Sequence, residues 1–94
     1  MMPLRCAVIG TGHLGSIHAR LLKSIEHVEL VGVVDPSPES RQRVAAECQT
    51  QALEHHRQLQ GQLDAAIIAT PTQLHYPVAA DLLHDNVHVL IEKP

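Results

Sequence analysis

Aromatic side chains are almost absent from this sequence of 94 residues. It contains no tryptophan and no phenylalanine, and Tyr76 is its single aromatic residue. Proteins that bind single-stranded nucleic acid stack the bases on aromatic side chains, so this composition disfavours that class. The formal net charge is −3, whereas proteins that bind phosphate backbones carry clustered positive charge. We therefore expect no nucleic-acid partner.

Long apolar runs and cysteines are also scarce. No apolar run approaches the roughly 18–20 residues that span a bilayer, and the N-terminal residues 1–5 are too short for a signal peptide. We therefore expect no membrane partner and a cytoplasmic location. Cys6 and Cys48 are the only cysteines, and they lie far apart in apolar surroundings. We interpret them as reduced packing residues and not as a disulfide.

Histidine is plentiful, with eight residues, but its spacing does not indicate a metal site. No two histidines lie four residues apart on one predicted helix with an evident third ligand. His55 and His56 are neighbours, and we expect them to point to different faces. We predict no metal site and interpret the histidines as residues of solvated faces, with His13 close to a glycine-rich turn.

Along the chain, segments with the hydrophobic pattern of strands alternate with segments with the hydrophobic pattern of helices. Hydrophobic residues make up 45% of the chain and charged residues 18%, as in one small globular domain. Short apolar runs predict strands over 4–9, 28–35, 63–70 and 87–91, with a further short strand over 50–53. Helices are predicted over 13–24, 37–48 and 74–83, with a helical turn at 55–60. Strands that alternate with helices predict an α/β fold, a doubly wound parallel sheet of the Rossmann type with about five strands. The apolar face of the first helix is expected to contain Leu14, Ile17, Leu21, Leu22 and Ile25.

A glycine-rich turn follows the first predicted strand. The residues are Gly10-Thr11-Gly12-His13-Leu14-Gly15, a G-x-G-x-x-G pattern that opens a helix. In such a turn Gly10 permits a tight bend, Gly12 lets a pyrophosphate approach the backbone, and Gly15 lets the helix pack on the strand. Free N–H groups around His13 and Leu14 then face the phosphates. The alternative is a simple strand–helix turn with packing glycines.

Asp35 ends the second predicted strand, 20 residues after Gly15. This is the separation expected for the carboxylate that accepts hydrogen bonds from the adenosine ribose of a dinucleotide. A carboxylate there repels a 2′-phosphate and favours NAD, while the nearby Arg41 and Arg43 leave NADP open. The alternative is an aspartate that only caps the turn before Pro36.

A second candidate segment follows the strand predicted over 63–70. Ala69, Thr70 and Pro71 are expected at the carboxyl end of that strand, the edge of an open α/β sheet where ligands bind. Thr72 is a candidate cap for the next helix, which contains His75. Taken alone, a histidine such as His75 is more often a surface or capping residue than a functional one.

Together these residues resemble a known family. Gly10-x-Gly12-x-x-Gly15, Asp35, the string 70–75 (TPTQLH) and the terminal Glu92-Lys93-Pro94 are similar to the N-terminal domain of the Gfo/Idh/MocA oxidoreductases. The resemblance covers the whole chain, 1–94, as one NAD(P)-binding domain. It implies a parent enzyme that moves a hydride between a nicotinamide cofactor and a CH–OH group of a sugar, nucleotide-sugar, cyclitol or related compound.

The resemblance also implies roles for individual residues. Lys93 would be catalytic, assisting proton movement beside the nicotinamide ribose and substrate. In the family a second domain completes the substrate site, so we expect this piece alone to bind dinucleotide without catalysis. The residues implied in cofactor binding are Gly10, Thr11, Gly12, His13, Leu14, Gly15, Asp35, Ala69, Thr70, Pro71, His75, Glu92 and Lys93.

Two other functions are alternatives to that of an oxidoreductase domain. A non-catalytic NAD-sensing or scaffold domain leaves Lys93 unexplained, and a methyltransferase or flavin protein explains neither T-P-x-x-x-H nor E-K-P.

The last predicted strand, 87–91, presents an apolar edge that normally pairs with further structure. We therefore expect this piece to self-associate.

Overall fold

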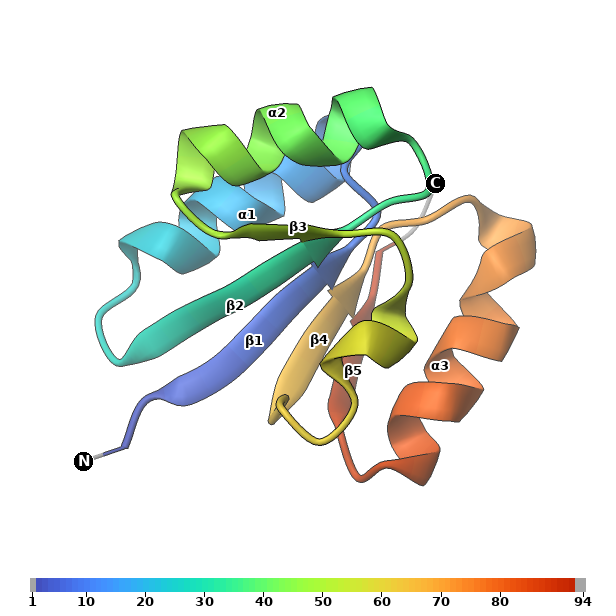
Figure 1. The fold of residues 1–94 in the computed structure, drawn as a ribbon. Coiled ribbons are helices and arrows are strands. Elements are labelled where there is room, and N and C mark those ends of the chain that lie inside the picture. The colour runs from blue at the N-terminus through green and yellow to red at the C-terminus, as the bar shows by residue number, and fades with distance from the viewer. Residues whose placement is uncertain (1, 93–94) are drawn as a thin grey trace.

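The computed structural model describes residues 2–92, and these form a five-stranded parallel sheet flanked by helices (Figure 1). The strand order is β3-β2-β1-β4-β5, which confirms the doubly wound parallel sheet predicted from the sequence. The strands are β1 (Leu4–Ile9), β2 (Val28–Val34), β3 (Gln51–Leu53), β4 (Ala65–Ile68) and β5 (His88–Ile91). The helices are α1 (His13–Ser24), α2 (Pro38–Cys48) and α3 (His75–His84), with 3₁₀ turns η1 (His56–Leu59) and η2 (Thr72–Leu74).

Local sequence signals explain where most elements begin. The Ser37 side chain accepts a hydrogen bond from the Ser40 N–H at 3.3 Å, and Pro38 occupies the first turn, so α2 begins where its cap predicts. β4 is shorter than the apolar run 63–70 predicts. Leu63 is buried in the turn that leads into the strand. The strand ends at Ile68, and a loop that contains Pro71 follows it.

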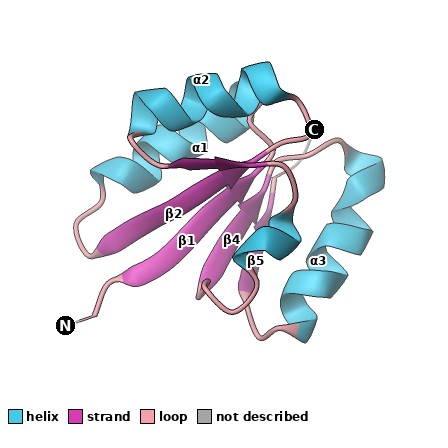
Figure 2. Cartoon of the chain, in the orientation of Figure 1, coloured by secondary structure: helices cyan, strands magenta, loops and turns pink. Residues whose placement is uncertain are grey.

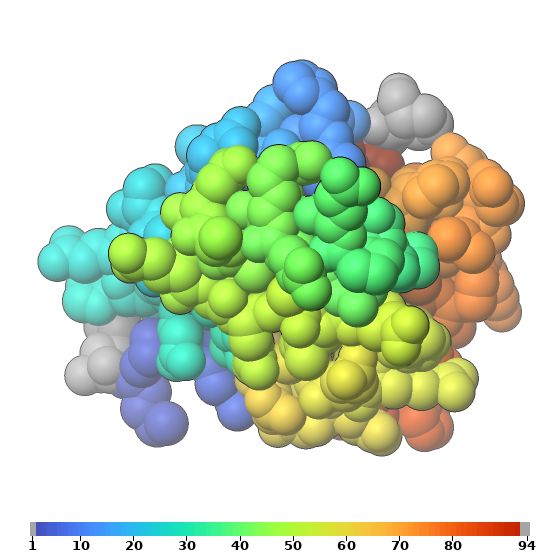
Figure 3. All heavy atoms as spheres, turned by 45° about the horizontal axis from the view of Figure 1, so that its top comes forward, coloured from blue at the N-terminus to red at the C-terminus, as the bar shows by residue number. Residues whose placement is uncertain are grey.

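The helices cover both faces of the sheet. α1 and α2 pack on one face and η1 and α3 on the other, and the elements are distinguished by type in Figure 2. Figure 3 shows the blue α1, the green α2 and the yellow segment after it forming one continuous face, with the orange segment around η2 and α3 at its side. Within the described part of the chain, no helix is long and apolar enough to cross a membrane.

The buried face of α1 differs from the predicted one. Gly15 and Ala19 are buried, whereas Leu14, Leu21 and Ile25 are 41%, 54% and 49% exposed. A Cβ atom on Gly15 would lie 1.8 Å from the carbonyl oxygen of Gly10. This close approach places the small residues against the sheet and turns several large ones outward, so the predicted apolar face is wrong in those positions.

Both cysteines are packing residues, as predicted. Cys6 and Cys48 are free and buried. Burial raises the pKa of both thiols, which favours their protonated form.

The strand order reverses between β1 and β4. The chain runs from β1 through β2 to β3 on one side, and β4 and β5 lie on the other. All strands are parallel, so their carboxyl ends meet at one edge of the sheet. The turn after β1 and the loop after β4 therefore lie next to each other, at the position where open α/β sheets bind ligands.

Candidate functional site

A cleft of about 560 Å³ lies at the carboxyl edge of the sheet. It is bordered by the segments that follow β1, β2, β4 and β5, which are far apart in the sequence. Its lining brings together most of the predicted cofactor-binding residues. The lining residues are Gly10, Gly12, His13, Leu14, Asp35, Pro36, Ala69, Thr70, Pro71, Thr72, Leu74 and Glu92.

The three motif glycines have different surroundings. Gly10 has a φ of +103°, and a Cβ there would lie 2.6 Å from the carbonyl oxygen of Ala69. Gly15 is buried against Gly10, so a side chain at either position collides with backbone. Gly12 is exposed, and a Cβ there would meet nothing within 4 Å. The first and third glycines are therefore needed for the fold, while the second leaves open space at the cleft.

The N-terminus of α1 faces this open space. Gly12 is the N-cap residue, no side chain caps the helix, and its first turn contains no acidic residue. The first N–H groups of a helix have no partner within the helix, and the helix dipole makes this end favourable for an anion. The arrangement suits a phosphate group lying over Gly12 and His13.

Asp35 connects the end of β2 to the glycine turn. Its Oδ2 accepts a hydrogen bond from the Thr11 N–H at 2.8 Å, and its Oδ1 accepts one from the Ser37 N–H at 2.9 Å. The bond to Ser37 is the turn contact considered as the alternative role of Asp35. A carboxylate has about four acceptor sites, so these bonds leave capacity for ribose hydroxyls. The two roles of Asp35 are compatible.

Thr11 supports the turn from beneath and does not line the cleft. It is fully buried, and its hydroxyl lies 2.7 Å from the Ser40 hydroxyl of α2. Ser40 Oγ also donates to the Thr11 carbonyl at 2.9 Å. The contact between Thr11 and Ser40 joins the glycine turn to the first turn of α2.

Arg41 of α2 contacts the backbone at Asp35. Its Nη1 donates to the carbonyl oxygens of Asp35 at 3.1 Å and Pro36 at 3.2 Å. These bonds hold the guanidinium beside the segment that follows β2. Positive charge therefore lies close to the carboxylate that is predicted to select NAD.

The loop after β4 is held by backbone and by His75. The Ala69 N–H donates to the Ile9 carbonyl at 2.7 Å, and His75 Nε2 lies 2.7 Å from the Thr70 carbonyl oxygen. His75 does not line the cleft, but it supports a residue that does. The predicted helix cap at Thr72 is wrong, because η2 intervenes and the N-cap residue of α3 is Leu74, without a side-chain bond.

Glu92 follows β5 and lines the opposite end of the cleft from Asp35. Its N–H donates to the Ile68 carbonyl at 2.9 Å, and its Oε2 is hydrogen-bonded to Nε2 of His18 on α1. The sequence interpretation placed His18 on a solvated face and missed this contact. The only local signal for this contact is that His18 lies one turn after Gly15, on the helix that the glycine motif opens. Lys93 and Pro94 lie outside the described residues, so the placement of the predicted catalytic lysine is not described.

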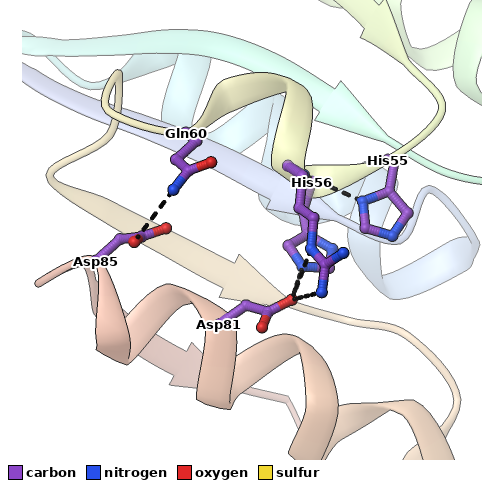
Figure 4. A network of polar contacts seen from close by, with 6 residues as sticks. His55, His56, Gln60, Asp81 and Asp85 are labelled. Carbon is purple, nitrogen blue, oxygen red and sulfur yellow. Dashed lines mark hydrogen bonds and ion pairs between the residues drawn. The ribbon is translucent and has the colours of Figure 1, made fainter.

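His55 and His56 do not point to different faces as predicted. Their ring centroids lie 4.3 Å apart in a stacked arrangement, because His55 is the extended N-cap residue of η1 and His56 begins the 3₁₀ turn. His56 Nε2 is bonded to Asp81 Oδ2 at 2.9 Å, and Arg57 Nε donates to the same oxygen at 3.2 Å (Figure 4). These contacts attach η1 to α3.

Comparisons with known proteins agree with this geometry. Residues 4–94 match the family GFO_IDH_MocA, described as "Oxidoreductase family, NAD-binding Rossmann fold". The chain is 42% identical over 94 residues to UDP-N-acetylglucosamine 3-dehydrogenase of Acidithiobacillus ferrooxidans, covering 100% of this chain and 29% of that protein. It is 34% identical over 95 residues to scyllo-inositol 2-dehydrogenase (NAD(+)) of Bacillus subtilis, covering 97% of this chain and 28% of that one.

Solved structures show the same fold. The crystal form P2₁2₁2₁ of the A. ferrooxidans enzyme superposes with a TM-score of 0.90 at 41% identity, covering 100% of this chain and 30% of that chain. GenD2 from gentamicin A biosynthesis, in complex with NAD, superposes with a TM-score of 0.94 at 28% identity, covering 100% and 28%. The chain thus spans less than a third of the length of these relatives. From its first strand to its last residue, the chain belongs to the Gfo/Idh/MocA oxidoreductase family, as the NAD-binding Rossmann domain.

Proposed function

We propose that this chain is the nucleotide-binding domain of an NAD(P)-dependent oxidoreductase that acts on a CH–OH group of a sugar, nucleotide-sugar, cyclitol or related compound. The observation that carries the proposal is the cleft between Asp35 and Glu92, with the glycine turn and the open helix N-terminus between them. The names of the relatives support the substrate class, since they include a nucleotide-sugar dehydrogenase and an inositol dehydrogenase.

The strand order suggests how a dinucleotide would cross the cleft. Asp35 follows β2, the glycine turn follows β1, Ala69 follows β4 and Glu92 follows β5, in the spatial order of the sheet. The adenosine ribose would bind Asp35, the pyrophosphate would lie over Gly12, and the nicotinamide end would reach Glu92.

A second hollow supports the placement of the adenine ring. It measures about 300 Å³ and adjoins the cleft through shared lining residues, including Asp35 and Leu74. The apolar side chains of Val34 and Val78 and the ring of His55 also line it. The flat ring face of an adenine base next to a ribose site fits such a hollow.

The chemistry of the reaction would be divided between cofactor and protein. The bound nicotinamide supplies hydride transfer. The chain would orient it through the glycine turn and the loop after β4. Lys93, proposed as the catalytic residue on the resemblance alone, would assist the proton transfer at the substrate hydroxyl. We propose that the 94-residue chain by itself binds dinucleotide without turnover.

Calorimetric titration of the 94-residue chain with NAD, NADP, FAD and S-adenosylmethionine tests the proposal. NAD should bind tightest, NADP more weakly, and the other two not measurably. Tighter binding of FAD or S-adenosylmethionine would overturn the assignment. Reduction of NAD by the chain with a nucleotide-sugar or inositol would overturn the statement that it lacks turnover.

A further inference from the structure

His18 makes a contact that the proposed binding roles do not use. It lies on α1, one turn after Gly15, and its Nε2 is hydrogen-bonded to Oε2 of Glu92, 74 residues further along the chain. An ionised carboxylate only accepts hydrogen bonds, so His18 donates through Nε2. The side chains of His18 and Glu92 are 20% and 32% exposed. The contact is therefore partly buried, behind the Glu92 side chain that lines the cleft, and is not a freely solvated surface pair.

The Glu92 main chain is fixed independently of His18. Its N–H donates to the Ile68 carbonyl, which extends the pairing of β5 with β4 by one residue. The Glu92 side chain has three rotatable bonds, and the bond from His18 holds its Oε2 toward α1.

The position of Glu92 gives this restraint a role in recognition. The cleft is lined by carboxylates at its two ends, Asp35 and Glu92, although it is proposed to hold the negatively charged pyrophosphate. At the first end the Asp35 carboxylate accepts bonds from the N–H groups of Thr11 and Ser37. At the other end His18 supplies a donor to Glu92. In both places a donor from the chain holds the carboxylate in one direction and offsets its negative charge.

We propose that His18 is a positioning residue, which holds the Glu92 carboxylate at the end of the cleft that receives the nicotinamide ribose. This inference rests on the proposed function, since it assumes that a dinucleotide crosses the cleft from Asp35 to Glu92. The oriented carboxylate accepts hydrogen bonds from the hydroxyls of that ribose. His18 itself does not line the cleft and acts through Glu92.

A comparison of two ligands separates this role from simple support of the fold. ADP contains the adenosine and pyrophosphate parts of NAD and lacks the nicotinamide half. With His18→Leu, the affinity for NAD should fall by about five- to tenfold, the effect of losing one hydrogen bond to a charged group. The affinity for ADP should stay within about twofold of the original chain, because its contacts end at the glycine turn.

Further variants complete the test. His18→Gln retains an N–H donor and should recover most of the NAD affinity. His18→Leu combined with Glu92→Gln should lose little more NAD affinity than Glu92→Gln alone, because the two residues act through one contact. His84→Leu removes an exposed histidine of α3 outside the cleft and should change neither affinity.

The outcomes are distinguishable. Equal losses for ADP and NAD would show that His18 only supports the glycine turn, and unchanged NAD affinity would show that it has no role in recognition; either result overturns the inference. If His18→Leu does not fold, the Glu92→Gln variant is measured in its place. An equal loss of affinity for ADP and NAD in Glu92→Gln would also overturn the inference. If the original chain binds ADP but not NAD, the nicotinamide end is wrongly placed. If it binds neither, the proposed function itself fails.

Discussion

At the scale of single residues, Gly12 differs from Gly10 and Gly15 in having open space where a side chain would be. We expect Gly12→Ala to fold and to weaken NAD binding by about tenfold or more, because the methyl group would keep the pyrophosphate from the backbone. The melting temperature should change by less than about 4 °C, which corresponds to at most about 1 kcal/mol, since 1 kcal/mol shifts a domain of this size by roughly 4–8 °C. Calorimetry and thermal unfolding check the two parts.

Gly15→Ala is the contrasting variant. Its methyl group would lie 1.8 Å from the Gly10 carbonyl oxygen, so α1 must move and the melting temperature should fall markedly. If Gly12→Ala instead melts as early as Gly15→Ala, the open space at Gly12 has been misread. Unchanged NAD affinity in Gly12→Ala would place the pyrophosphate elsewhere.

Asp35 gives a second prediction at this scale. Asp35→Ala should weaken NAD binding about tenfold more than NADP binding, since it removes the ribose acceptor and also the negative charge that opposes a 2′-phosphate. Arg41, beside Asp35, is then available to the phosphate. Glu39→Ala, an exposed acidic residue in the first turn of α2, is the matched control and should leave both affinities unchanged. Equal losses of the two cofactors in Asp35→Ala would contradict the ribose assignment.

At the scale of elements, the contact between η1 and α3 depends on Asp81. Its hydrogen bond from His56, supported by the charge and hydrogen bond of Arg57, holds the pKa of the Asp81 carboxyl below its ordinary value. A carboxyl whose pKa is lowered on folding stabilises the fold above its unfolded pKa, near 4. That stabilisation is lost as the pH falls through the lower folded value.

The Asp81→Asn variant tests this contact between η1 and α3. At pH 7 it should melt below the original chain. The difference should shrink as the pH falls from about 4 through the lower folded pKa, because the unfolded state of the original chain is protonated first and the folded state after it. Thermal unfolding across this pH range measures it. Asp85→Asn, which alters only the 3.5 Å contact with Gln60, is the control. A difference that stays constant down to pH 2 would contradict the role given to the Asp81 charge.

Elements with strong local signals could be predicted from the sequence, and contacts between distant elements could not. The bounds of α1 and α2 follow from the glycine turn and from Ser37-Pro38. The buried face of α1 did not follow, because hydrophobicity alone does not indicate that Gly15 and Ala19 pack closest to the sheet. Among the cleft residues, the loop 69–71 was predicted from the edge rule of parallel sheets, and the glycine turn and Asp35 from the motif and its spacing. Glu92 was implied only by the family resemblance. The bond from His18 to Glu92 joins residues 74 apart and has no local pattern.

At the scale of the whole molecule, β5 is an edge strand with apolar side chains on it. Within residues 2–92 it pairs only with β4, and Leu90 and Ile91 are 56% and 45% exposed. A shallow hollow of about 250 Å³ between α1 and β5 continues this apolar surface and includes Leu22, Ile67 and Leu90. An exposed apolar edge favours pairing with another chain.

We therefore predict that the 94-residue chain self-associates through β5. Light scattering coupled to size exclusion should show a mass that rises with concentration toward a dimer. Leu90→Lys should shift the chain to a monomer, while Leu83→Lys, at an exposed leucine of α3, should not. A monomer at every concentration would refute the prediction.

Because the strand order reverses, the cleft is lined by two separate parts of the chain, one before Gly61 and one after it. Gly10, Gly12 and Asp35 precede the exposed turn at Gly61, whereas Ala69, Thr70 and Glu92 follow it. No segment of the backbone crosses from one group to the other except through that turn, and the two parts meet through the pairing of β1 with β4. A dinucleotide bound across the cleft would therefore act as a bridge between two halves of the polypeptide. We expect two separate peptides divided at Gly61 to form a split protein whose reassembly is strengthened by the cofactor.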